Sequence, residues 1–260
     1  MMYENSKEVR NLIRRGKLFR QTSGLAPGYV QANLVILPRE IAFDFFIFCQ
    51  RNPKPCPILE VLEPGRYEPV LMAPGADIRV DAPLYRIYKD GELVSEERDI
   101  TNYWSSELTS FLLGCSFTFE NALMRAGISL RHIVEGKNVS MYVTNLQAIP
   151  AGIFSGPVVV SLRPITVSKV VRAMQITSRF PSSHGAPIHI GDPQVIGIHD
   201  LARPDYGDPV EIREDEVPVF WACGVTSQAV ALKSKPSLMI THSPGHMFIT
   251  DIIDEDLAVL

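Results

Sequence analysis

The sequence has no long apolar run. Its longest apolar patches, residues 41–48 and 111–113, are far shorter than the roughly 20 residues that a membrane-spanning helix needs, and Asp44 interrupts the first. The polar start, MMYENSKEVRNLIRRG, has no apolar core and no small-residue cleavage site, so it does not resemble a secretory signal. We therefore expect a cytoplasmic protein with no membrane partner.

An excess of basic residues is missing as well. The chain carries 25 Lys and Arg against 29 Asp and Glu, a formal net charge of −4. Proteins that bind a phosphate backbone usually show a basic patch or stripe. The run Arg14-Arg15-Gly16-Lys17 is short and fits the solvated face of an N-terminal helix. No nucleic-acid partner is expected.

Several cofactor and catalytic signatures are absent too. The chain contains neither GxGxxG nor GxxxxGK[ST], which excludes the usual nucleotide-binding loops, and it lacks the GxSxG hydrolase motif. Its four cysteines, Cys49, Cys56, Cys115 and Cys223, form no CxxC pair, which excludes a zinc ribbon. In a reducing cytoplasm they are expected as free thiols. We predict no cofactor and assign no residue as a metal ligand.

Apolar strands and helices alternate along the chain. This alternation predicts an α/β (mixed α+β) fold, with mixed sheets covered by helices. A hairpin is expected over residues 83–95, where Asp90-Gly91 supplies the turn. Helices are expected over 5–20, 39–49 (apolar nearly all round) and 167–177, and strands over 30–37, 158–162, 217–222, 238–241 and 247–253.

The two halves of the sequence resemble each other. LVILP and VVVSLRP each lead into a helix and then an Arg-x-Pro sequence, and FLLGCSFTFE aligns with VFWACGVTSQ. The second alignment matches Cys115 with Cys223 and Glu120 with Gln228. We interpret the echo as an internal duplication, with an N-terminal helix and turn (1–29), a first α/β half (30–148) and a second (149–260) in one compact body whose halves can intertwine. A site between the halves would bring the two cysteines together.

Cys115 has two interpretations. As part of one long helix over residues 108–123, it lies on an apolar stripe and is a small core residue. By analogy with Cys223, it instead follows a strand and precedes a helix, whose N-terminus favours the thiolate. Cys223 is followed by Gly224, which lets a ligand approach the backbone.

Charged loop residues are candidates for binding a carboxylate. Asp77, Arg79 and Asp81 alternate, so an extended segment would present all three on one side. A guanidinium there could bind a carboxylate through two N–H groups, although a local Asp–Arg ion pair is the alternative. Arg51 and Arg179, equivalent under the duplication, are further candidates.

The loop histidines are open to more than one use. His242 and His246 flank Pro-Gly, which excludes a helical pair of metal ligands, but a metal site with Asp251 stays open. A general base is the other option, because an imidazole titrates near neutral pH. For His189, in the turn-rich loop that also holds His184, we favour a purely structural role.

Seven long blocks of the sequence carry a family resemblance. They are RNPKPCPILEV, PGADIRVDAP, GCSFTFE, SGPVVVSLRPI, TSRFPSSHGAPIHIGDP, VFWACGV and THSPGHMFITD. With these blocks the chain resembles the "putative hydro-lyase" family, whose domain recurs in mitochondrial D-glutamate cyclase. The resemblance runs from Gly24 to Asp251. It implies a carbon–oxygen lyase that converts a small amino acid, as D-glutamate to 5-oxo-D-proline plus water, or the reverse.

Residue types suggest roles in such a reaction. Arg79 is the first candidate to hold the α-carboxylate, and His246 or Asp251 could take a proton from the ammonium group. A proton donor could be Cys223, Cys115 or Glu120, if burial raises the pKa of the group.

A second hypothesis is a non-catalytic protein that binds a carboxylate metabolite and regulates a partner. Under either hypothesis the expected partner is a small amino or carboxylic acid. The oligomeric state, a homodimer among the options, is left open.

Overall fold

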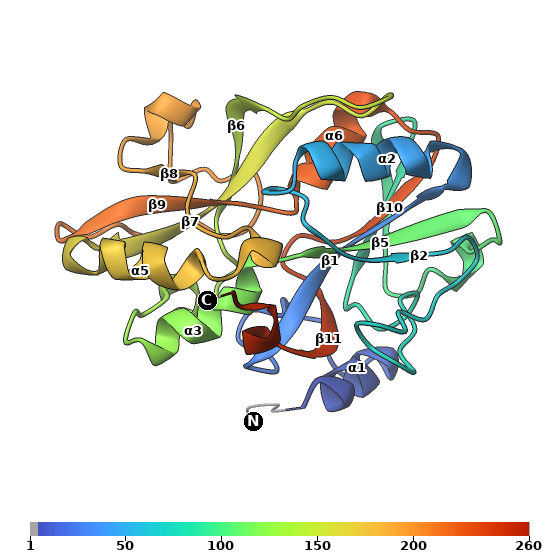
Figure 1. The fold of residues 1–260 in the computed structure, drawn as a ribbon, viewed down its shortest axis with the longest axis horizontal. Helices are drawn as coiled ribbons and strands as arrows, with labels where there is room; N and C mark the ends of the chain where they lie inside the picture. Colours follow the sequence, from blue (N-terminus) through green and yellow to red (C-terminus); the bar gives the residue numbers. More distant parts are fainter. Residues whose placement is uncertain (1–4, 260) are drawn as a thin grey trace.

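The computed structural model describes residues 5–259, which form two β-sheets flanked by helices (Figure 1). The first sheet has the order β2-β5-β1-β10-β3-β4, with β11 also paired to β1, and the second has the order β6-β7-β9-β8. The strands are β1 (Tyr29–Pro38), β2 (Ile58–Leu62), β3 (Tyr85–Lys89), β4 (Glu92–Glu97), β5 (Leu108–Gly114), β6 (Met141–Gln147), β7 (Pro157–Thr166), β8 (His189–Ile190), β9 (Glu216–Ala222), β10 (Met239–His242) and β11 (Phe248–Ile253). The helices are α1 (Ser6–Arg14), α2 (Arg39–Arg51), α3 (Glu120–Arg125), α4 (Arg131–Val134), α5 (Val170–Thr177) and α6 (Thr226–Ser234).

Every strand pairing within residues 5–259 is antiparallel. The predicted α/β layering is confirmed, but the expected mixed sheets are wrong in strand direction. The reason is visible at β1 and β2, which α2 connects in sequence. Strand β5 lies between them in the sheet, so each runs antiparallel to β5 and they do not pair with each other.

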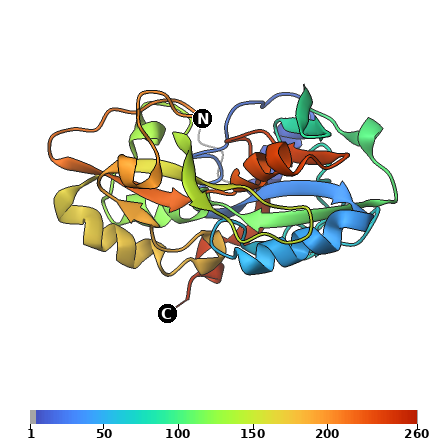
Figure 2. The ribbon, with the colours of Figure 1, turned by 90° about the horizontal axis from the view of Figure 1, so that it is seen from above.

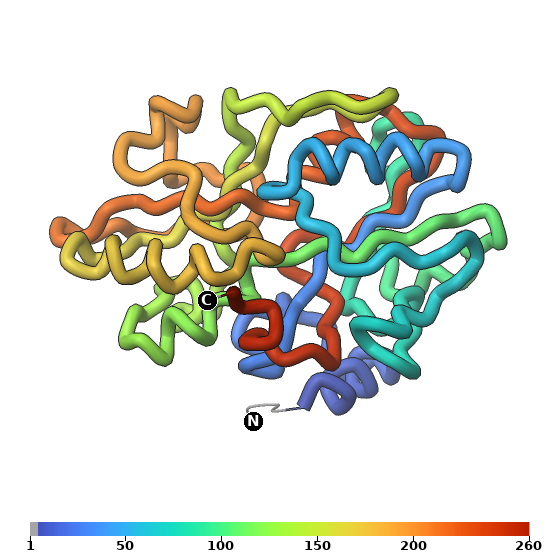
Figure 3. Tube along the Cα trace, in the orientation of Figure 1, coloured from blue at the N-terminus to red at the C-terminus, as the bar shows by residue number. Residues whose placement is uncertain are grey.

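Helices α2 and α5 lie on the same side of the two sheets (Figure 2). Phe45 of α2 packs edge-on against Phe111 of β5, with ring centroids 5.0 Å apart, and also against Phe154. Ile176 of α5 belongs to the buried cluster of Trp221 in β9. The trace from β6 to β7 leaves the second sheet, passes over α2 and returns (Figure 3). This crossing ties the two sheets into one body.

Most predicted elements are confirmed, including the helix after Pro38, the strand over 158–162 and the Asp90-Gly91 hairpin. The helix predicted over 167–177 begins with a 3₁₀ turn, Val167–Lys169, and continues as α5. The helix predicted over 5–20 is too long, because α1 ends at Arg14 and Gly16 turns the chain with a φ of +64°. The helix over 39–49 is apolar nearly all round, which predicts burial on several sides, but Phe43 is 70% exposed and the buried residues are Ala42, Phe45, Phe48 and Cys49. None of the helices in residues 5–259 is long and apolar enough to cross a membrane.

The two sheets repeat one strand order. The first contains β2-β5-β1 and the second β8-β9-β7, and a helix on the same side of the sheets follows β1 and β7. This agrees with the sequence echo, although the duplication and the boundaries at 29/30 and 148/149 stay predictions. Strand β6 joins the second sheet, whereas β10 and β11 return to the first.

Candidate functional site

Cys115 and Cys223 meet where the two sheets join. Strand β5 ends at Gly114 and β9 at Ala222, and each is followed by a turn and a helix. The two thiols share one buried cluster, which also contains Phe117 and Met247. The strand–turn–helix interpretation of Cys115 is therefore confirmed, and the single helix over 108–123 is wrong because 108–114 form a central strand. We call residues 114–116 and 222–224 the cysteine seam.

The two turns of the seam have the same hydrogen bonds. The backbone N–H of Thr118 donates to the carbonyl of Cys115 at 3.1 Å, and that of Thr226 donates to Cys223 at 3.0 Å. The hydroxyl of Thr118 accepts from a backbone N–H of β1 and the hydroxyl of Thr226 from one of β7. The Cys-x-x-Thr pattern thus fixes equivalent turns at the ends of β5 and β9.

Asn33 of β1 connects the two turns. Its Nδ2 donates to the carbonyl of Gly114 at 2.6 Å, and its side chain lies against Gly224 so closely that a Cβ there would collide with it. The carbonyl of Ser182 approaches Gly114 in the same way. Both positions of the seam therefore need glycine for close approach.

Both seam thiols keep their protons at neutral pH. Burial raises the pKa of Cys115 and raises the pKa of Cys223 to about 11, although a backbone N–H two residues further on opposes the shift in each. The thiolate expected at a helix N-terminus is thus not favoured. A protonated thiol is the form that can donate a proton, and residues Cys115 and Cys223 are 5% and 7% exposed. All four cysteines are free, as predicted.

A buried ionic cluster lies beside the seam. Arg163 of β7 donates to Glu120 Oε1 at 3.0 Å and to the hydroxyls of Ser116 and Ser161 at 2.9 Å each. His132 Nε2 lies 3.0 Å from the same Glu120 oxygen. Burial alone would raise the pKa of Glu120, but His132 and Arg163 lower it to about 2. Glu120 is therefore a carboxylate, and the proton-donor role expected for it does not fit.

Arg86 of β3 belongs to a second polar cluster. Its Nε donates to Glu96 at 2.8 Å, and its Nη1 lies 3.4 Å from the side-chain oxygen of Gln228, the counterpart of Glu120 in the echo. Its guanidinium also lies over the ring of Tyr206, 5.9 Å from the centroid. Tyr206 packs in turn against the cysteine cluster. Arg163 thus pairs with Glu120 beside one turn of the seam, and Arg86 contacts the counterpart of Glu120, Gln228, beside the other.

His246 lies in the loop that brings Met247 into the cysteine cluster. Its Nδ1 is 3.1 Å from the carbonyl of Pro244, which can only accept, so Nδ1 carries the proton and Nε2 holds the lone pair. Burial lowers the pKa of His246, while nearby Glu96 opposes the shift. The ring is therefore neutral at pH 7, the form that a proton acceptor needs; the role of His246 as a base stays a prediction.

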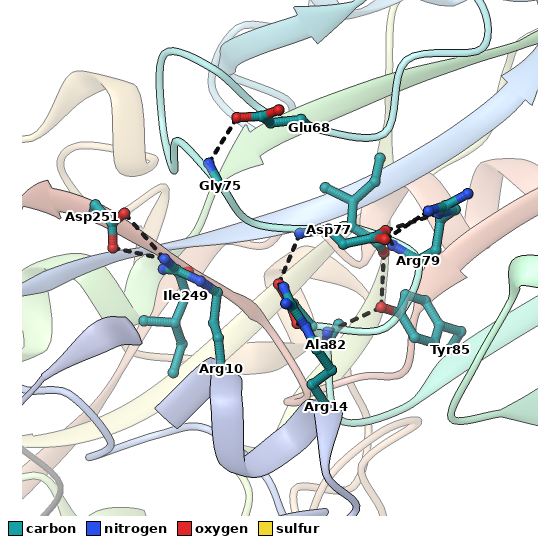
Figure 4. Close-up of polar contacts among 12 residues, drawn as sticks. Arg10, Arg14, Glu68, Gly75, Asp77, Arg79, Ala82, Tyr85, Ile249 and Asp251 are labelled. Carbon is teal, nitrogen blue, oxygen red and sulfur yellow. Dashed lines mark hydrogen bonds and ion pairs between the residues drawn. The ribbon is translucent and has the colours of Figure 1, made fainter. Parts of the chain in front are cut away.

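Asp251 lies beside Arg10 of α1, whereas Asp77 and Arg79 pair with each other on the far side of Arg14 (Figure 4). Arg79 donates to Asp77 through Nε at 2.9 Å and Nη2 at 2.7 Å, and stacks 3.6 Å from the centroid of Tyr67. The segment forms turns, so the extended arrangement expected for residues 77–81 is wrong. Asp251 pairs with Arg10 of α1 at 2.9 Å. These contacts support the local ion-pair alternative.

The other predicted residues also lie outside the seam cluster. Arg51 donates to the carbonyl of Pro150 and Arg179 lies 3.4 Å from Glu255, both on the surface. His242 Nδ1 accepts the N–H of Leu34 at 3.1 Å and so substitutes for a strand partner. Within residues 5–259 no three His, Cys, Asp or Glu side chains gather to hold a metal ion.

Sequence reasoning missed Asn33, Arg86 and Arg163. A signal for two of them was present, because Asn33 and Arg163 are polar residues inside mainly apolar strand sequences. Arginine is almost never fully buried unless it is paired, and Arg163 is 1% exposed. A charge within VVVSLRP is therefore a marker of a buried polar site.

The D-glutamate cyclase family model matches residues 109–251, more than half of the chain and both turns of the seam. The chain belongs to the D-glutamate cyclase family. It is 63% identical to a "putative hydro-lyase" of Geobacillus kaustophilus and 64% identical to one of a Thermoanaerobacter species, each over 98% of this chain and 97% of the relative. A Bacillus subtilis protein of the same name is 61% identical, over 98% and 99%. The predicted family is confirmed, and hydro-lyases are carbon–oxygen lyases, the predicted enzyme class.

Proposed function

We propose that this family member interconverts D-glutamate and 5-oxo-D-proline plus water at the cysteine seam. One observation carries the proposal. Both cysteine turns, the His246 loop and the Arg86 cluster meet around one buried cluster, and so a proton donor, a proton acceptor and a cation lie close together. The identity of the family supports the choice of reaction.

His246 and Cys223 fit the proton transfers that this reaction requires. Ring closure forms a bond between the amino nitrogen and the side-chain carboxyl carbon and breaks one C–O bond. Two protons leave the ammonium nitrogen and two reach the departing oxygen, which leaves as water. His246 can accept a proton at Nε2, and Cys223 can donate one because its thiol stays protonated. Holding the substrate bent contributes through orientation.

For the α-carboxylate we propose Arg86 in place of Arg79. Arg79 already uses Nε and Nη2 on Asp77. Arg86 uses Nε on Glu96, and its Nη2 makes no hydrogen bond within residues 5–259. Each guanidinium thus keeps one terminal nitrogen without a partner in residues 5–259, but only Arg86 adjoins the cysteine cluster, through Tyr206, where it can bind a carboxylate.

We also propose that the protein acts in the cytoplasm on a free small acid, without nucleic acid or membrane. Four free, buried thiols fit a reducing compartment.

The test follows D-glutamate, L-glutamate and both 5-oxoproline enantiomers by chiral chromatography, with and without a chelator. Turnover that is lost in Arg86→Gln but kept in Arg79→Ala and in the exposed control Arg203→Ala would support the proposal. Loss in Arg79→Ala alone would restore the sequence-based assignment. Binding of glutamate without turnover would favour the carboxylate-binding regulatory protein, and neither binding nor turnover would overturn the glutamate assignment.

A further inference from the structure

A strained turn packs against the cysteine seam. It runs from the 3₁₀ turn Pro181–Ser183 into His184, and the carbonyl of Ser182 lies against Gly114. His184 has φ +78° and ψ −14°, the left-handed conformation that a side chain disfavours and glycine adopts freely. A histidine held in this conformation next to a candidate site points to a use for its ring.

The ring of His184 has one bonded and one free nitrogen. Nδ1 lies 2.7 Å from the carbonyl of Lys54, which can only accept, so Nδ1 carries the proton and Nε2 holds a lone pair. Nε2 is buried and has no hydrogen-bond partner among residues 5–259, and the same holds for the neighbouring Ser183 Oγ. These two buried atoms, on consecutive residues of the turn beside the seam, can therefore each accept a hydrogen bond from a guest.

The charged side chains that act on His184 are both cationic. They are Arg163 and Lys54, which together with the larger effect of burial lower the pKa of the ring to about 4. Cations nearby disfavour a guest ammonium and favour the neutral amine. Lactam closure needs the neutral amine, because an ammonium nitrogen has no lone pair to attack with.

We propose that Ser183 Oγ and His184 Nε2 accept hydrogen bonds from the reacting nitrogen of the substrate, and from the lactam N–H of the product. The subsite recognises an N–H group and holds it as an uncharged amine. This assignment rests on the proposed function. It adds two residues that touch substrate and leaves proton uptake to His246.

The test separates N–H recognition from binding in general. It compares the dissociation constants of 5-oxo-D-proline and of 3-oxocyclopentane-1-carboxylate of matching configuration, in which a CH₂ replaces the ring N–H. His184→Asn tolerates the left-handed backbone and can still donate to Lys54, but its short side chain does not reach the position of Nε2. His184→Gln restores an acceptor near that position. His189→Asn is the control, since His189 instead bonds the Asp192 carbonyl at 2.6 Å.

We expect the wild-type protein to bind the lactam at least about tenfold more tightly than the carbocycle. His184→Asn should reduce this ratio to near one at an unchanged unfolding temperature, His184→Gln should keep part of it, and the control should keep all of it. Ser183→Ala, which leaves the strained backbone alone, should lower the ratio several-fold.

A wild-type preference that survives in both His184→Asn and Ser183→Ala would overturn the subsite and leave the proposed function standing. A wild-type protein that binds neither ligand and turns over no glutamate would overturn the proposed function, and the subsite with it.

Discussion

The side chain of Asn33 lies directly against the α-carbon of Gly224, in the space that any larger residue there would need. The same side chain donates to the carbonyl of Gly114 at 2.6 Å. One buried amide on β1 therefore sets the distance between the end of β5 in the first sheet and the end of β9 in the second. The relative position of the two seam thiols depends on it.

Gly224→Ala should therefore destabilise the protein, by about 1–3 kcal/mol, because the new methyl group overpacks against Asn33. Adding Asn33→Ala should recover part of that loss by vacating the space. Urea unfolding of both single variants and the double variant measures the coupling. Simple additivity of the two losses would mean that the residues do not press on each other.

Glu120→Gln should cost about 3 kcal/mol at neutral pH, because it leaves Arg163 buried without a counter-charge. The pKa of Glu120 is about 2 in the folded protein and 4.5 ordinarily. Because the pKa of Glu120 is lower in the folded state, its carboxylate stabilises the folded protein fully above pH 4.5. This stabilisation is lost as the pH falls from 4.5 towards 2. The free energy of unfolding of the wild type should decrease over that range, and the variant should lack this part of the decrease. Parallel curves would rule out the Glu120 contribution.

The rate should depend on the neutral form of His246. Because burial lowers its pKa below the ordinary 6.5, the acid limb of kcat/KM should lie below pH 6.5. His246→Gln should lower the rate about 100-fold and remove that limb, whereas the exposed His199→Gln should change neither. An unchanged limb in His246→Gln would assign the titration to another group.

Cys223→Ala should lower kcat about 100-fold or more with a smaller effect on KM, because it removes the proposed proton donor. Cys49→Ala is the matched control: Cys49 is also a free, buried cysteine, but it packs among the phenylalanines of α2, outside the seam. Equal losses in the two variants would indicate a packing effect and not an acid.

Asp251→Asn should weaken the attachment of α1 and leave the chemistry intact. Arg10 is 4% exposed and pairs with Asp251 at 2.9 Å, so its charge would remain buried without a partner, at a cost of about 3 kcal/mol. Thermal unfolding and kcat, measured on the same sample, distinguish the outcomes. A fall in kcat at unchanged stability would restore the catalytic role predicted from the sequence.

Local signals account for what the sequence predicts of the fold. The Asp90-Gly91 turn, the apolar strand 30–37 and the helix after Pro38 depend on residues close together in the chain. The strand order does not. Strand β10 lies between β1 and β3, and no local pattern reveals a pairing between residues 36 and 240.

For the candidate site, too, part of the arrangement can be predicted from the sequence and part cannot. The echo between the halves brings Cys115 and Cys223 together correctly, because equivalent turns end β5 and β9. The alternating charges of residues 77–81 lead to a wrong position for Arg79, because that pattern assumes an extended chain. The segment forms turns, and so Arg79 donates to Asp77, two residues earlier. Arg86 is missed because its surroundings come from distant segments, Gln228 and Tyr206 among them.

The position of β10 has a consequence for folding during synthesis. Residues 239–242 are synthesised long after β1 and β3, yet they lie between these two strands in the first sheet. Until they arrive, both neighbouring strands have unpaired backbone edges, and such edges promote association between incomplete chains. A nascent chain of this protein should therefore need protection on the ribosome until β10 and β11 have entered the sheet.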